Sequence, residues 1–517
     1  MDLRLRGTLL HRIIPTRIVS RQYRSAPSAI TTQTQPTRRP TPEQPPLPPR
    51  PSPGNPVSLP DHRRLATEQE LFFSSPASPG SPLFLPNGSR IFHKLQEFLR
   101  AQYAYYGFQE IVSPTIFKKS LWEQSGHWDR YSQDMFIVTG RGASGGAKET
   151  LEIGEEEEYG LKPMNCPGHC LIFKSSTKSH RDLPVRYADF SPLHRNEVSG
   201  SLSGLTRVRR FHQDDAHIFC RPSQISSEIT STLEFINTAY KVFRLPEHKL
   251  VLSTRPENHI GEISEWDRAE AALREALNAS GKEWSTNERD GAFYGPKIDI
   301  ILKDSDGKEH QTATIQLDFQ LPARFGLVYQ MPAPELEEKV LEATTPAETG
   351  KSGLAAPVII HRAIFGSLER FMALLIEHYN GRWPFWLSPR QAIVIPVVNT
   401  NELVAYAKGV QRTVSGVEGP TPASSSATAA QPLGRRAFVV DIDTSGKSLS
   451  KKIQEARSMK YNHVIVVGES NLKSGTVTVS SRVDEVPPDG AVQKPVGKEL
   501  LAPEVYAMFV NLEKQYR

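Results

Sequence analysis

The chain has 517 residues, of which 38% are hydrophobic and 23% are charged, and its formal net charge is +5. This length suits two or three domains with a large buried core, and so mild a charge means that a nucleic acid would be bound by local basic patches. The three cysteines, Cys166, Cys170 and Cys220, are too few for a disulfide framework, which excludes the disulfide-rich secreted class and fits a reducing compartment.

Residues 1–60 differ in composition from the rest of the chain. They contain nine arginines, no lysine and only two acidic residues. Leucines and isoleucines alternate with the early arginines, which is typical of a mitochondrial presequence, although a disordered basic tail is the alternative. No apolar run there approaches the roughly 20 residues that span a bilayer. Proline dominates from Pro36 to Pro60, so this part is predicted to be an extended linker. We expect import into the mitochondrial matrix, and cleavage between Tyr23 and Pro60.

A helix and a strand are predicted next. Apolar residues at helical spacing predict a helix from Gly88 to Tyr106, and the run from Phe108 to Val112 predicts a strand that Pro114 ends. Any α/β protein offers this pattern, so by itself it is weak. The stretch from Gly140 to Gly160 is polar and is predicted to be a solvated insertion.

The segment from Lys162 to Phe173 raises the question of a metal site. Cys166 and His169 have the C-x2-H spacing of a ligand pair, and Cys170 is nearby. Alternatively, Pro167 and Gly168 begin a helix in which His169 simply caps or packs. On these residues alone, both interpretations stay open.

Two extended runs follow, joined by a loop rich in glycine and serine. The first ends in HRNE, and the second is RVRRFHQDDAHIFC. With the two-residue period of a strand, polar and aromatic side chains of the second run share one face, which suits a charged ligand better than a solvated edge strand. These side chains are Arg207, Arg209, Phe211, Gln213, Asp215, His217 and Phe219. Arg195 would face Arg207 and Arg209 across this hairpin, and guanidinium groups without neighbouring carboxylates favour phosphate.

Further strands are predicted to complete an antiparallel sheet with one polar face. After a helix near Ser223–Phe243, strands are expected at 293–300 and 312–320. Lys297 and Gln316 would face the polar cleft, with a structural salt bridge as the alternative for Lys297. A strand at 358–362, a turn at Gly366 and a helix at 367–379 would place Arg370 one turn into the helix, where it suits an anion.

The pattern changes after Leu387. Short apolar runs at 392–398, 437–440 and 463–467 alternate with helices, which predicts a small, mostly parallel α/β domain ending in a helix at 502–514. The run 415–431 is predicted to be an insertion. A basic cluster near one helix could meet the phosphates of a nucleic acid or form a solvated face. Its members are Lys447, Lys451, Lys452, Arg457 and Lys460.

These motifs together resemble a known family. HRNE, the small-residue loop and RVRRFHQDDAHIF look like motif 2 of class II aminoacyl-tRNA synthetases, in the form found in threonyl-tRNA synthetases. NCPGH and HRAIFGSLERF are similar to the same family, and the helix, strand and proline near residue 110 resemble motif 1. The resemblance covers about Asp61 to the C-terminus. It implies an α+β catalytic domain at 61–386, an antiparallel sheet flanked by helices, which follows the presequence and linker at 1–60 and precedes a smaller α/β anticodon-binding domain at 387–517.

The resemblance also implies roles for individual residues. A zinc ion would be held by Cys166, His217 and His361, which leaves the fourth position to the amino and hydroxyl groups of threonine and so rejects valine. Threonine would contact Gln213, Asp215, Tyr294 and Lys297. ATP, with Mg²⁺, would contact Arg195, Glu197, Arg207, Phe211, Gln316 and Arg370. Arg195 and Arg370 would be the catalytic residues.

The implied activity is threonine–tRNA ligation in mitochondrial translation. The partners would be ATP, L-threonine, tRNA(Thr) and a second copy of the chain, with no membrane. Bacterial-type members of the family carry an editing domain before the core, and no candidate region for one remains here, so slow removal of mischarged serine is expected. The rivals are a synthetase-like RNA-binding protein without chemistry, a seryl or prolyl relative and a zinc hydrolase.

Overall fold

The computed structural model describes residues 60–139, 158–303, 307–331, 353–417, 434, 436–482 and 497–517. The predicted presequence and linker, most of the predicted insertion at 140–160, and most of the one at 415–431 lie outside these residues. None of the helices in the described ranges is both long and apolar enough to cross a membrane.

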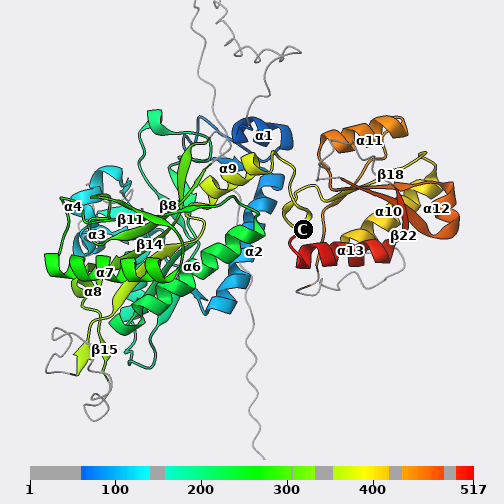
Figure 1. Cartoon of the computed structure of the whole chain (residues 1–517). Coiled ribbons are helices and arrows are strands. Elements are labelled where there is room, and N and C mark those ends of the chain that lie inside the picture. Colours follow the sequence, from blue (N-terminus) through cyan, green and yellow to red (C-terminus); the bar gives the residue numbers. More distant parts are fainter. Residues whose placement is uncertain are drawn as a thin grey trace, which may run out of the picture. The chain divides into compact units, whose positions relative to one another are not determined.

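An eight-stranded sheet forms the centre of the larger part of the chain (Figure 1). In spatial order its strands are β12 (Trp284–Asn287), β11 (Lys249–Ser253), β13 (Lys297–Lys303), β14 (Glu309–Asp318), β17 (Val358–Ala363), β10 (Asp215–Cys220), β7 (Val185–Asp189) and β3 (Gln109–Glu110). All neighbouring pairs are antiparallel except β11–β12 and β3–β7 at the two ends. The predicted antiparallel sheet is therefore confirmed.

One face of this sheet packs on the helices of the main core, whereas the other packs in part on α5 (Cys166–Lys174) and α8 (Gln320–Phe325) and in part lines a cavity. The helices that contribute to the main hydrophobic core are α1 (His62–Gln69), α2 (Pro86–Tyr106), α6 (Ile225–Val242), α7 (Ile263–Ala279) and α9 (Leu368–His378). In β10 and β17, Ile218 and Ile360 belong to this core. Because side chains alternate along a strand, His217 and His361 lie on the opposite face. The α2 and α9 ranges agree with the predicted helices.

The run from 207 to 219 is not one strand, as the sequence suggested. It forms β9 (Arg210–His212), which pairs with β8 (Pro192–His194) in a separate hairpin, and β10, which belongs to the large sheet. The break lies at Asp214, whose buried carboxylate accepts hydrogen bonds from the backbone N–H groups of Ile364 (2.7 Å) and Phe365 (3.0 Å). These bonds tie the break to the turn after β17, a long-range contact that the local alternation does not report.

Shorter elements complete this part of the chain. They are β1 (Phe72–Phe73), β2 (Leu83–Phe84), β4 (Ile116–Lys118), α3 (Lys119–Ser125), α4 (His127–Tyr131), β5 (Ile137–Val138), β6 (Tyr159–Leu161), α5 (Cys166–Lys174), α8 (Gln320–Phe325), β15 (Tyr329–Gln330) and β16 (Leu354–Ala355). Helix α5 begins at Cys166, as the Pro-Gly pair predicted.

A second, five-stranded sheet is built from the C-terminal residues. Its order is β19 (Val440–Ile442), β18 (Ala392–Pro396), β20 (His463–Val467), β21 (Thr476–Ser481) and β22 (Lys498–Leu501). The first three strands are parallel, as predicted, but β21 and β22 are antiparallel. The helices are α10 (Asn401–Ser415), α11 (Leu449–Ser458), α12 (Glu469–Ser474) and α13 (Ala502–Lys514).

Alternating residues of β18 pack into two different hydrophobic cores, one on each face of the five-stranded sheet. Val394 packs with apolar residues of α10 and α13, whereas Ile393 and Ile395 pack with those of α11. Helix α11 therefore covers the face opposite to α10 and α13, as Figure 1 shows. One member of the predicted basic cluster is not available for RNA, because Lys452 is 2% exposed and its ammonium donates to the Asp443 carbonyl (3.1 Å).

Candidate active site and metal centre

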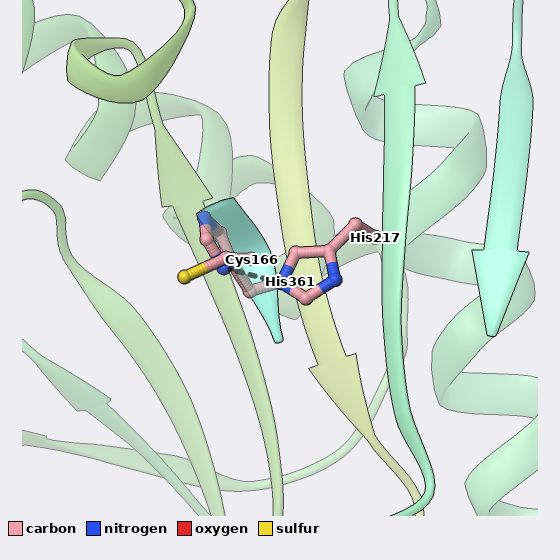
Figure 2. Close-up of side chains that lie close together, drawn as sticks. All are labelled: Cys166, His217 and His361. Atoms are coloured by element: carbon pink, nitrogen blue, oxygen red, sulfur yellow. Dashed lines mark hydrogen bonds between the residues drawn. The ribbon is translucent and has the colours of Figure 1, made fainter. Parts of the chain in front are cut away.

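Three buried side chains of metal-ligating types, from distant segments, meet on the face of the large sheet that lies opposite the main core. Cys166 is the first residue of α5, and His217 and His361 are paired neighbours on β10 and β17. One donor atom from each lies within 4.8 Å of the other two. Figure 2 shows these side chains, with the 2.9 Å contact between His217 Nε2 and His361 Nδ1 as a dashed line. This is the set that the resemblance implied.

Each of the two histidines has a second polar partner outside the three-residue cluster. His361 Nε2 lies 2.8 Å from a carboxylate oxygen of Asp318, which can only accept, so this nitrogen carries the hydrogen and Nδ1 keeps its lone pair toward the cluster. His217 Nδ1 contacts His169 Nδ1 at 2.8 Å, and the other nitrogen of His169 lies 3.7 Å from Asp189. Outer partners of this kind orient metal-binding histidines. His169 therefore lies behind a candidate ligand, and the cluster of donors in the described residues contains Cys166 with His217 and His361 and not with His169.

Burial shifts the pKa values of two of these side chains in opposite directions. Burial, together with the neighbouring His169 and His361, holds the pKa of His217 well below its usual value, so the imidazole is neutral and able to ligate. Burial raises the pKa of the Cys166 thiol well above its usual value. A bound cation reverses that effect by stabilising the thiolate. One thiolate and two imidazoles are a donor set that suits zinc.

A cavity of about 530 Å³ opens over the three donors. It contains all four residues predicted to bind threonine, namely Gln213, Asp215, Tyr294 and Lys297. Asp215 accepts a hydrogen bond from the Asn165 amide (3.1 Å), and the Tyr294 hydroxyl donates to Gln316 (2.9 Å). Gln316, predicted as an ATP contact, therefore lies in this cavity and beside Tyr294.

Lys297 carries the salt bridges that the alternative prediction proposed. Its ammonium lies 2.9 Å from Asp299 and 3.4 Å from Asp290. The lysine still lines the cavity, but its charge is shared with two carboxylates. An anion bound there would meet less positive potential than the sequence alone indicated.

A smaller cavity of about 210 Å³ contains the arginines of the hairpin and of α9. Arg195, Glu197, Arg207, Phe211 and Arg370 all line it. The Arg195 guanidinium stacks 5.0 Å from the centre of the Phe211 ring. Burial and the nearby Arg195 and Arg207 lower the pKa of Arg370, which indicates cations crowded around one space. Such a space attracts phosphate oxygens.

One expectation about these arginines is wrong. Arg207 is not free of carboxylates, because its guanidinium binds Glu197 at 2.8 Å. Strand pairing explains the contact, because Arg195 lies opposite Arg209 in the hairpin and its N–H donates to the Arg209 carbonyl (2.8 Å). Glu197 and Arg207 each lie two positions further toward the loop, so they approach each other as well. Arg209 turns away and donates to the Glu197 carbonyl (2.8 Å).

The two cavities adjoin. Arg195, Gln213, Gln311, Thr314 and Ala363 line both of them. A ligand could thus extend from the metal-binding cluster past Arg195 into the arginine-rich cavity. The outer partner Asp318 was not singled out from the sequence, although its place in the polar alternation of β14 was the available signal.

Comparison with known proteins agrees with this arrangement. Residues 150–379 match the tRNA synthetase class II core domain (G, H, P, S and T), and residues 391–497 match an anticodon binding domain. The "Probable threonine--tRNA ligase, mitochondrial" of Schizosaccharomyces pombe is 50% identical over 82% of this chain and 85% of its own length. The chain belongs to the threonyl-tRNA synthetase family.

Other relatives in the family are longer. The "Threonine--tRNA ligase, mitochondrial 1" of Arabidopsis thaliana is 47% identical over 82% of this chain but only 52% of its own length, so the chain spans about half of that relative. A solved structure, the RNA binding domain of threonyl-tRNA synthetase from Cryptosporidium parvum, has a TM-score of 0.73 at 42% identity and covers 87% of this chain and 98% of its own. The class II core followed by an anticodon-binding domain, which the resemblance predicted, is thereby confirmed.

Proposed function

We propose that this protein is a threonine–tRNA ligase, which activates threonine with ATP and transfers it to tRNA(Thr). The observation that carries the proposal is the Cys166, His217 and His361 cluster, which opens into a cavity that adjoins the arginine-rich one. A hydrolase would have no use for that second cavity. An RNA-binding protein without chemistry would need neither.

In the first step, the carboxylate of threonine attacks the α-phosphate of ATP. Arg195 lies where the cavities meet, so we assign it to the α-phosphate, where it stabilises the charge that develops. Arg370 would contact ATP from the other side of the smaller cavity, and Phe211 offers an aromatic face for adenine. The carboxylate needs no general base, so positioning and electrostatics supply the catalysis, with Mg²⁺ accompanying ATP.

Selection of threonine would depend on the larger cavity. A zinc ion held by the three donors would supply a Lewis-acid position for the amino and hydroxyl groups of the amino acid. Asp215 would accept the hydrogen bond of the hydroxyl, and Gln213 and Tyr294 would fix the backbone of the substrate. Valine, which lacks the hydroxyl, would leave these polar groups unpaired and be rejected, whereas serine would not.

We assign residues 61–386 to catalysis and 387–517 to binding the anticodon of the tRNA. Lys451 and Arg457 of α11 are exposed and are the members of the basic cluster best placed for phosphates. Because serine carries the hydroxyl that the metal site would read, some mischarging with serine is expected. The family models match the catalytic core and the anticodon-binding domain, so slow hydrolysis of seryl-tRNA by this chain is also part of the proposal. Rapid hydrolysis by the purified protein would contradict it.

A homodimer is proposed through the region of α2 and β3. Strand β3 is the last strand of the large sheet, and beside it Tyr105 and Val112 are 82% and 85% exposed. An edge strand flanked by exposed apolar side chains is a favourable surface for a second copy.

Mitochondrial matrix location is proposed from the arginine-rich residues 1–60, and two of the similar relatives carry mitochondrial names. Cytoplasmic relatives are also 46–48% identical, so sequence identity does not distinguish the two compartments and the proposed location rests on the N-terminal residues. N-terminal sequencing of protein isolated from mitochondria is the test. A mature chain that begins with Met1 would contradict the proposed processing.

The activity is tested by amino-acid-dependent exchange between ATP and pyrophosphate, with threonine, serine, valine and proline, before and after chelation. We expect rapid exchange with threonine, weaker exchange with serine, none with valine, and loss on chelation that added zinc restores. Exchange with proline and not threonine, or no exchange by protein that contains zinc, would overturn the proposed function.

A further inference from the structure

A buried histidine of the first helix contacts two elements of the arginine-rich cavity. His62 begins α1 and is 5% exposed. Its Nδ1 lies 2.7 Å from a carboxylate oxygen of Glu377, in the last turns of α9, and the same oxygen accepts the backbone N–H of His62 (3.2 Å). Its Nε2 accepts the backbone N–H of Leu205 at 3.3 Å. One ring thus joins α1, α9 and the loop between β8 and β9.

Both partners require the same form of this ring. The Glu377 carboxylate can only accept a hydrogen bond, so Nδ1 must carry the hydrogen. The Leu205 N–H can only donate, so Nε2 must keep its lone pair. Leu205 itself is fully buried, and an unpaired buried N–H is costly. The ring is therefore fixed in a single neutral tautomer, and both of its nitrogens are in use.

The loop that His62 contacts forms a tight turn from Ser203 to Arg207, and Thr206 within this turn contacts Arg370. Ser203 and Arg207 exchange backbone hydrogen bonds (3.1 and 3.3 Å), and Gly204 between them has a φ of +48°. The Thr206 carbonyl accepts a hydrogen bond from Arg370 Nε at 3.0 Å. Glycine at 204 leaves room for the ring, because a Cβ there would lie 2.1 Å from His62 Nε2.

These contacts form a closed circuit. Starting in α9, Glu377 binds His62, His62 binds the Leu205 N–H, and the next carbonyl, of Thr206, binds Arg370, which is again in α9. The turn carries Arg207 and accepts a hydrogen bond from Arg370 through the Thr206 carbonyl, and both arginines line the cavity. Within the described residues, the His62 ring is the acceptor of the Leu205 N–H.

We propose that His62 is a positioning residue for ATP: by accepting the Leu205 N–H it holds the 203–207 turn, and with it Arg370 and Arg207, in the geometry that binds the nucleotide. The proposal rests on the proposed function in that the nucleotide is taken to be ATP. It goes beyond that function because His62 touches neither cavity and acts only through the turn.

Two substitutions separate the two hydrogen bonds of the ring. Asparagine at 62 reaches the position of Nδ1 and can still donate to Glu377, but it has no atom near Leu205. Glutamine reaches the position of Nε2 and its amide oxygen can accept the Leu205 N–H. His62→Asn should therefore lose the function of the ring, and His62→Gln should keep much of it. His93→Asn, at an exposed histidine of α2, is the matched control.

The full chain and its variants are compared in threonine-dependent exchange and in binding of a non-hydrolysable ATP analogue. For His62→Asn we expect the KM for ATP and the Kd for the analogue to rise roughly tenfold, which corresponds to about 1.4 kcal/mol, with an unchanged KM for threonine and unchanged zinc content. His62→Gln should stay within about threefold of the wild type, since it preserves the bond that matters.

Gly204→Ala provides a second route if His62→Asn does not fold. Its methyl group would push the His62 ring away from Leu205, and alanine at a φ of +48° would also strain the turn, so the same selective loss of ATP affinity is expected. The proposal is overturned if a folded His62→Asn or Gly204→Ala protein binds the analogue as the wild type does. It is also overturned if ATP and threonine affinities fall equally, or if glutamine is no better than asparagine. A wild-type protein that binds the analogue but shows no exchange would contradict the proposed function and leave the role of His62 measurable.

Discussion

Asp318→Asn is the substitution that tests the metal centre most sharply. The side chain of Asp318 is fully buried, and one of its oxygens lies 2.8 Å from His361 Nε2. The other oxygen accepts the backbone N–H groups of Gln320 (2.7 Å) and Leu321 (3.0 Å). An asparagine would keep its oxygen on these two donors, because only an oxygen can accept from them. Its NH₂ group would then face the ring.

The size of the effect follows from this conflict between donors. A ring nitrogen that faces an NH₂ group must give up its hydrogen, so His361 would carry the hydrogen on Nδ1, which faces the cluster. That tautomer cannot ligate a metal through Nδ1. Loss of an outer partner usually lowers metal affinity about 10- to 100-fold, or about 1.4 to 2.7 kcal/mol, and we expect the upper end because the tautomer itself is reversed.

Zinc affinity is measured by competition with a chromogenic chelator, in parallel with threonine-dependent exchange at increasing free zinc. Exchange should be weak at low zinc and recover as zinc is raised. Asp443→Asn is the matched control, since Asp443 also accepts a backbone N–H, that of Ser445 (2.8 Å), but belongs to the C-terminal sheet. Wild-type zinc affinity in Asp318→Asn, or lost exchange at full zinc occupancy, would refute the assignment of the tautomer.

Three further predictions concern other parts of the molecule. Gln316→Ala should raise the KM for threonine about 2- to 10-fold, because the hydrogen bond from Tyr294 is lost, and should leave the KM for ATP unchanged. If steady-state exchange shows a higher KM for ATP and an unchanged KM for threonine, Gln316 contacts ATP instead. Val112→Asp should shift the protein from dimer to monomer in sedimentation velocity, whereas an unchanged dimer would mean that this 85% exposed side chain lies outside the interface. Burial lowers the pKa of His127 from 6.5 to about 4. Between pH 6.5 and pH 4 the unfolded state therefore binds a proton that the folded state does not, so the free energy of unfolding should fall by up to about 3 kcal/mol as the pH drops through this range. His127→Gln should flatten the dependence of the urea midpoint on pH in that window, and an equally steep dependence in the variant would assign it to other groups.

Local sequence patterns were enough to predict most of the secondary structure around the site. Helix α2, strand β17, the N-terminus of α5 and helix α9 lie where apolar spacing, Pro-Gly and the glycine turn placed them, because these signals depend on neighbouring residues only. The alternation along β10 also put His217 on the face away from the core. The break at Asp214 was missed because it depends on backbone donors about 150 residues later in the chain.

Charges near the site were harder to predict than elements. Arg207 was expected to be free of carboxylates, yet it is paired with Glu197, and Lys297 forms the salt bridge that was only the alternative prediction. The Glu197–Arg207 contact depends on the register of the β8–β9 hairpin, and the Lys297–Asp290 contact depends on how a loop returns to β13. A one-residue change in the hairpin register would separate Glu197 from Arg207, so composition cannot reveal that pair, whereas Lys297 and Asp299 lie two positions apart on one face of β13.

The sequence by itself determined which family the protein belongs to, because motifs of contiguous residues are enough to show the resemblance. Apolar residues with a period of 3.6 predicted the helices, and those with a period of two predicted the strands. Only the tertiary structure decided which side chains act together. Antiparallel pairing of β10 and β17 makes His217 and His361 neighbours although 144 positions separate them, and the end of β14 brings Asp318 behind one of them. The circuit through His62 closes in the same way. Such contacts are set by strand register and helix packing across the whole core, and no local pattern of residues contains that information.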